Sequence, residues 1–128
     1  MKPLSPLARI LTVAFVTSGV IHLVRPQVFE DTIPPQLPAH RELVLASGVA
    51  ELAGAVGMWL PRTRRIAGVA SAVLLVAVFP ANVQMTLDAA EVVQTKGSSP
   101  ERIAWLSGTV ARLPLQLPLI RAAWRAGR

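Results

Sequence analysis

The chain has 128 residues, of which 52% are hydrophobic and only 16% are charged, and it contains no cysteine. The charged fraction is well below the quarter or so that is typical of water-soluble proteins, and the mean hydropathy of +0.50 is correspondingly high. The length suits one domain over residues 1–128, and the lack of cysteine excludes disulfides, thiol catalysis and cysteine-ligated clusters.

Four apolar stretches follow one another along the chain. They cover about residues 7–24, 41–60, 65–87 and 101–124. About 20 helical residues cross a hydrocarbon core of roughly 30 Å, and a helix satisfies its backbone groups within its own segment. A cleaved signal peptide is the alternative for the first stretch, but Arg25 and Pro26 follow it where a small-residue cleavage site would stand. The sequence therefore predicts an all-α, integral membrane four-helix bundle.

The connections between these stretches differ in length. A tight basic turn at residues 61–65 (PRTRR) joins the second and third stretches. The loop at 25–40 contains four prolines, which oppose a regular helix there, and the loop after residue 87 ends in the breaker run KGSSP at 96–100. We expect any site to open on the side of the two longer loops.

The distribution of basic residues predicts the orientation. With both termini in the cytoplasm, that side carries eight basic residues and no acidic one: Lys2, Arg9, Arg62, Arg64, Arg65, Arg121, Arg125 and Arg128. The opposite side carries four basic residues, Arg25, Arg41, Lys96 and Arg102, and six acidic ones. Because the cytoplasmic face holds the basic excess, the chain is predicted to lie in the inner (plasma) membrane with both termini inside. The net charge of +6 is then explained by the orientation in the membrane. Because the basic residues flank the spans, a nucleic-acid partner is not expected.

Two charged residues, Glu51 and Arg112, lie within the predicted spans. Each is about ten residues from the outer end of its helix, which places both about 15 Å deep. An isolated charge there costs at least about 2.5 kcal/mol, so pairing is favourable at equal depth. We expect the two to face each other, either as a structural ion pair or as part of a site.

Of the further polar residues in the spans, His22 and Asn82 lie nearer the outer surface, and Gln116 lies one turn below Arg112 on the same face of its helix. Together with Glu51 and Arg112 they are the candidate ligand-binding residues, because their order fits a polar cavity open to the outside. Small residues beside them make room for a cavity, although close helix packing explains such residues equally well. No metal motif is present.

The order of these features resembles the DoxX-like family of small four-helix membrane proteins. The resemblance covers about residues 15–124 and rests on these segments: residues 18–22 (SGVIH) with Pro26 and Phe29, 33–35 (IPP), 43–51 (LVLASGVAE), 60–65 (LPRTRR), 78–82 (VFPAN) and 112–116 (RLPLQ). No single segment is specific to the family, and the resemblance depends on all six occurring in this order.

The resemblance implies an accessory subunit of a membrane oxidoreductase complex, with a membrane or peripheral oxidoreductase as its partner. On this interpretation the chain has no intrinsic cofactor and binds a quinone-like or lipid molecule in an outward-facing polar cavity. Two alternatives stay open: an isomerase-like membrane enzyme acting on a hydrophobic substrate with Glu51 as acid or base, and a purely structural subunit. The sequence does not decide whether the protein is an enzyme, and it is compatible with a homo-oligomer.

Overall fold

The computed structural model describes residues 3–128, so the predicted cytoplasmic residue Lys2 lies outside the described residues. The described chain is helical, with no strand between residues 3 and 128. Its helices are α1 (Pro6–Val24), α2 (Gln27–Glu30), α3 (His40–Trp59), α4 (Arg64–Lys96) and α5 (Pro100–Arg125). All except α2 are long and apolar enough to cross a membrane. The predicted all-α fold with four potential spans is therefore confirmed.

Local signals in the sequence explain where the helices begin. Ser5 caps α1 by accepting a hydrogen bond from the amide of Ala8 at 3.2 Å, and Ser99 caps α5 in the same way. In both cases a proline follows the serine directly, where its missing N–H is not needed. The breaker run before residue 100 thus ends in a helix start, as the sequence predicts.

The C-terminal end of α3 is held by a buried arginine. Arg64 donates from Nε to the carbonyl of Met58 at 2.7 Å and from Nη2 to the carbonyl of Trp59 at 3.4 Å. A cation at this position satisfies the last carbonyls of the helix and interacts favourably with its dipole. The basic turn after α3 therefore stabilises the helix in addition to marking one end of the bundle.

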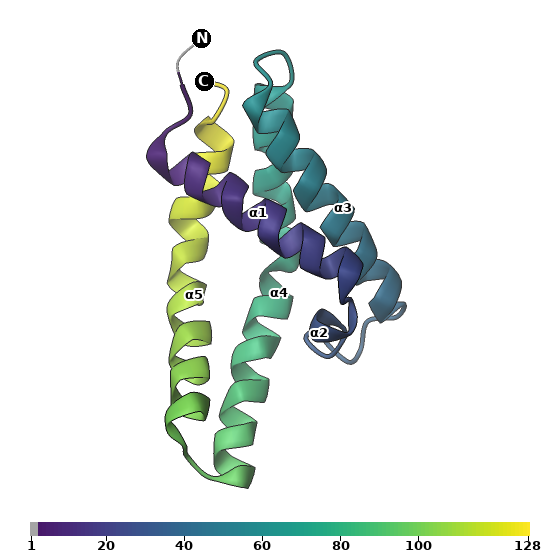
Figure 1. Ribbon diagram of the computed structural model, residues 1–128, viewed down its shortest axis with the longest axis vertical. Coiled ribbons are helices and arrows are strands. Elements are labelled where there is room, and N and C mark those ends of the chain that lie inside the picture. Colours follow the sequence, from purple (N-terminus) through teal and green to yellow (C-terminus); the bar gives the residue numbers. More distant parts are fainter. Residues whose placement is uncertain (1–2) are drawn as a thin grey trace.

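The four long helices form a closed ring in which each helix packs against two others. α3 packs against α1 and α4, and α5 packs against α4 and α1. Both termini and the α3–α4 turn lie at one end, with α2 farther down the bundle and the α4–α5 turn at the other end (Figure 1). All the described basic residues assigned to the cytoplasm belong to segments at the end with the termini.

The structure corrects two details of the predicted connections. α4 continues to Lys96, nine residues beyond the predicted end at residue 87, so the second long loop shrinks to residues 97–99. Hydrogen bonds between side chains one turn apart, such as Gln84 to Asp88 at 2.9 Å, support this polar extension. The helix is about 50 Å long at 1.5 Å per residue, more than a hydrocarbon core requires. The proline-rich loop, in turn, includes the single helical turn α2.

The apolar core occupies the half of the bundle nearer the termini. Its buried members come from all four long helices: Leu11, Phe15, Ala55, Met58, Ala67, Ala72, Leu75 and Ala123. The helix exteriors are also apolar, and Ile66 and Leu117 are 76% and 75% exposed. A bundle with an apolar outer surface and polar groups inside is the arrangement that a lipid environment favours.

Candidate functional site

A cavity of about 200 Å³ adjoins the apolar core, whose members Leu11, Phe15 and Leu75 form part of its wall. Four of the candidate residues, His22, Glu51, Asn82 and Arg112, line it, one from each long helix. The cavity is also lined by Phe29 of α2 and by residues of the loop that follows α2. It is therefore a chamber to which every long helix contributes at least one hydrogen-bonding or ionisable side chain, with Ser18 and Ser47 in addition to the four candidates.

The crossing of α1 and α3 sets the position of the first two residues. At this crossing, a Cβ atom on Gly48 would lie only 2.6 Å from the Cβ of His22, and one on Gly19 would lie 2.9 Å from the carbonyl oxygen of Gly48. Such close approach requires residues without side chains, as is common between membrane helices. Because His22 and Glu51 each lie about one turn beyond a glycine, the crossing brings them together.

The imidazole of His22 is fixed by three neighbours. Its Nδ1 donates to the carbonyl oxygen of Ser18 at 2.6 Å, and its ring stacks on Phe29 with 3.9 Å between centroids and 17° between planes. Nδ1 lies 3.8 Å from Oε2 of Glu51, which is an ion-pair distance but too long for a hydrogen bond. Since a carbonyl only accepts, Nδ1 carries a proton, and in the neutral ring Nε2 remains an acceptor.

Two polar atoms on the cavity residues are buried without hydrogen-bond partners in the described chain. They are Oε2 of Glu51 and Nδ2 of Asn82. A buried polar group without a partner costs on the order of 1–3 kcal/mol, and native proteins leave few of them. Glu51 and Asn82, which both line the cavity, thus keep spare hydrogen-bonding capacity.

Arg112 is oriented by Gln116, one turn further along α5. Nη1 of Arg112 donates to Oε1 of Gln116 at 3.0 Å, and Nε2 of Gln116 donates to the carbonyl oxygen of Leu75 in α4. The carbonyl that lacks its helical donor because of Pro80 is that of Val76, next to Leu75, so the bond from Gln116 falls in the turn that Pro80 interrupts. Gln116 does not line the cavity, and it positions the guanidinium that does.

The structure does not form the expected direct pair between Glu51 and Arg112. In residues 3–128 the ion pairs join Glu51 to His22 and Arg41 to Glu30. The reason is the packing order, because α3 and α5 are diagonal in the ring and do not contact each other in the described chain. Neighbouring helix axes are about 9 Å apart, so a diagonal is roughly 13 Å. Glu51 and Arg112 therefore line the same cavity without forming a direct ion pair.

A second hollow, of about 210 Å³, lies between α4 and α5. It shares Asn82, Met85 and Arg112 with the first cavity, and Trp105 and Gly108 are on its α5 side. A Cβ atom on Gly108 would meet no other atom within 4 Å, so the space beside it is open. Asn82 and Arg112 therefore stand between the inner cavity and a largely apolar slot on the side of the bundle.

Comparison with known proteins gives one match. The family described as "Domain of unknown function (DUF8561)" matches residues 11–127. The chain belongs to this DUF8561 family. No curated protein and no solved structure matches the chain.

The DUF8561 match contains every residue that lines the inner cavity, from Leu11 to Leu119. The site is thus built entirely within the family's domain. Of the five sequence-selected residues, four line the cavity and Gln116 supports it. Reasoning from the sequence missed Thr32 and Met85, which lie on its wall, since neither has a charge or a spacing that singles it out.

Proposed function

We propose that the protein is a four-span membrane protein of the inner (plasma) membrane with both termini in the cytoplasm. Four helices of sufficient length and apolar outer surface support the insertion. The concentration of basic residues at the end with the termini supports the orientation. On this proposal, α2 and the α4–α5 turn lie on the outer side and the inner cavity lies under α2.

The topology can be tested with single cysteines, because the chain has none of its own. Ser98→Cys lies in the α4–α5 turn and Ser5→Cys lies before α1. A membrane-impermeant maleimide applied to intact cells is expected to label Ser98→Cys, and to label Ser5→Cys only after permeabilisation. Labelling in the reverse order would contradict the orientation, and equal labelling of both before permeabilisation would contradict the insertion.

Within the membrane, we propose that the protein is an accessory subunit that binds a quinone-like or lipid molecule. The observation that supports this most strongly is the presence of unpartnered buried atoms on Glu51 and Asn82, two residues from different helices that line the same cavity. Polar residues that only hold helices together need to be paired with one another, whereas a binding site needs groups that can still form hydrogen bonds with a ligand. The likeness to DoxX-like proteins favours an oxidoreductase as the partner complex.

The chemistry of the cavity suits a head group with both carbonyl and hydroxyl oxygens. Asn82 and the unused N–H groups of Arg112 can donate to a carbonyl oxygen, while Glu51 and Nε2 of His22 can accept from a hydroxyl. A quinone presents carbonyl oxygens that accept hydrogen bonds, and its reduced form, the quinol, presents hydroxyl groups that donate them. A space of about 200 Å³ is below the 300–1,000 Å³ of drug-sized pockets, so it suits a ring-sized head group.

The apolar tail of such a ligand has a route out of the bundle. The hollow between α4 and α5 adjoins the cavity at Asn82 and Arg112, and its other walls include Trp105 and Gly108. A chain leaving there would enter the hydrocarbon phase sideways. The same slot gives a way to block the ligand without changing the polar groups, since a Cβ atom at residue 108 meets no protein atom within 4 Å and a side chain there would extend into the slot.

The decisive experiment is native mass spectrometry of the gently extracted protein. We expect a bound small molecule in the wild type, its loss in Glu51→Gln and in Gly108→Leu, and its retention in Glu91→Gln. Glu91 is the matched control because it is exposed on α4, away from both cavities. A chain that is bare, or that carries only another polypeptide in every variant, would refute the ligand site and favour a structural subunit.

The isomerase-like alternative has one observation in its favour. His22 lines the same cavity as Glu51, so an ionisable imidazole accompanies the single carboxylate and could serve as the second member of an acid–base pair. Conversion of an added hydrophobic substrate to its isomer by the wild type, and by neither His22→Gln nor Glu51→Gln, would support an enzyme over an accessory subunit.

A further inference from the structure

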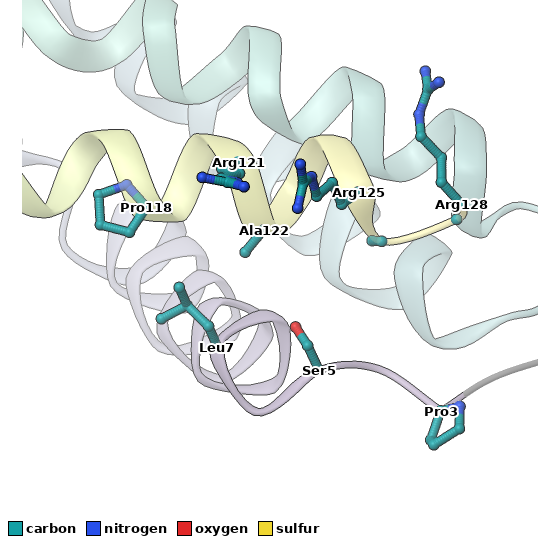
Figure 2. Close-up of a pocket in the computed structure, with 10 residues that line it drawn as sticks. Pro3, Ser5, Leu7, Pro118, Arg121, Ala122, Arg125 and Arg128 are labelled. Carbon is teal, nitrogen blue, oxygen red and sulfur yellow. The ribbon is translucent and has the colours of Figure 1, made fainter.

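A separate groove of about 590 Å³ lies at the other end of the bundle from the proposed ligand cavity. Its walls are the start of α1, with Ser5 and Leu7, and the last two turns of α5, with Pro118, Arg121 and Arg125 (Figure 2). None of the residues that line the inner cavity takes part in it. The groove is therefore a second feature, unrelated to the polar chamber.

Two arginines in this groove have no protein partner. Arg121 and Arg125 are four residues apart on α5, so they lie on the same face of the helix, and both are exposed. In residues 3–128 neither forms a hydrogen bond or an ion pair with another side chain. The neighbouring Arg128 differs, because its guanidinium lies 4.8 Å from the centre of the Trp124 ring and its Nε donates to the Trp124 carbonyl.

Within residues 3–128, no aspartate or glutamate side chain forms an ion pair with either arginine. The last acidic residue in the sequence is Glu101, 20 residues before Arg121 on the same helix. Glu51 is nearer, because it is at about the depth of Arg112, nine residues and about 14 Å before Arg121 along the helix axis, which is still more than one Debye length at physiological salt. The two guanidinium groups therefore favour an anion that comes from outside the protein.

The rest of the groove is suited to an apolar chain. Leu7, Pro118 and Ala122 line it beside the arginines (Figure 2). On the proposed topology this end lies at the cytoplasmic surface of the membrane, where the head groups of anionic lipids are found. Basic pockets between helices at this level bind lipid phosphates.

We propose that this groove binds an anionic phospholipid, with Arg121 and Arg125 on its phosphate and an acyl chain along Leu7, Pro118 and Ala122. The inference rests on the proposed membrane placement and is independent of the ligand in the inner cavity. Arginine suits this role because its planar guanidinium bonds phosphate oxygens in pairs.

The test is a lipid titration of the delipidated protein in neutral detergent, followed by native mass spectrometry. We expect phosphatidylglycerol to bind at one site in clear preference to phosphatidylcholine. Each basic residue contributes a factor of about five to anionic lipid binding, so R121Q/R125Q is expected to weaken phosphatidylglycerol binding about 25-fold. The matched control is R9Q/R62Q, which removes two exposed arginines from the same end outside the groove and is expected to keep the lipid.

A second variant tests the contribution of the groove's shape separately from that of its two arginines. Ala122→Trp is expected to displace the lipid by filling the groove while both arginines remain. Equal loss in R9Q/R62Q, or no preference between the two lipids, would overturn the proposal in favour of diffuse attraction. Displacement of phosphatidylglycerol by 10 mM inorganic phosphate, on the order of cellular phosphate levels, would overturn the lipid as occupant in favour of a free phosphate. Failure of the wild type to float with vesicles would instead refute the membrane placement.

Discussion

The α1–α3 crossing allows a sharp test, because the position of the cavity residues depends on two glycines. In Gly48→Ala, the new methyl would lie 2.6 Å from the Cβ of His22 and 3.1 Å from the carbonyl oxygen of Gly19. Carbon atoms in contact are about 3.5–4.0 Å apart, so the methyl intrudes by roughly 1 Å. Neither Cβ can rotate away, and the two helices have to separate.

The expected cost follows from this overlap. Forcing one methyl group into a packed interface costs about 1–3 kcal/mol in the free energy of unfolding. Replacing a mid-helix glycine by alanine gains up to about 1 kcal/mol in helix propensity, which partly conceals the cost. Gly108→Ala has the same propensity gain without the overlap, because no atom lies within 4 Å of its new Cβ. The difference between the two variants, about 1–3 kcal/mol, isolates the steric effect.

The measurement is the free energy of unfolding of both variants in lipid bicelles, followed by helical circular dichroism. We also expect the bound molecule to be weakened in Gly48→Ala and kept in Gly108→Ala, since only the first moves His22 relative to Glu51. If the two variants unfold with free energies within about 0.5 kcal/mol of each other, the crossing is looser than the structure indicates and the reasoning fails.

Two more predictions concern polar contacts between helices. Gln116→Leu removes the bonds to Arg112 and to the Leu75 carbonyl, and it is expected to lower the free energy of unfolding by about 1–3 kcal/mol and to weaken ligand binding. Unchanged stability and binding would show that Arg112 does not need this support. Trp59→Phe removes the hydrogen bond from Nε1 to Oγ1 of Thr12 at 3.0 Å, and a loss of only about 0.5–1 kcal/mol is expected, because such bonds average about 0.6 kcal/mol within membranes. A loss above about 2 kcal/mol would mean that the ring also packs α1 against α3, and Trp105→Phe, which breaks no such bond, is the control.

Much of the fold can be predicted from the sequence, because long apolar runs are a local property. The spans of α1, α3 and α5 are predicted to within one residue at each end, since their limits coincide with charges, prolines and capping serines. α4 was underestimated for a physical reason. Hydropathy shows where a helix would leave the lipid, whereas the helix itself continues until Gly97, whose φ of 83° ends it.

Charged and amide residues within the spans could be selected from the sequence, because their height along a helix follows from counting residues. Buried Thr12 and Ser71 were not selected, and Arg64 was assigned to the basic turn. Which of the selected residues meet depends on the packing of the helices. Equal depth suggested that Glu51 pairs with Arg112, but depth carries no information about which helices are neighbours. The glycine crossing places α1 beside α3, which gives Glu51 the imidazole of His22 as its neighbour. Arg112 remains across the cavity on the diagonal helix, and contact between residues far apart in sequence depends on that packing order.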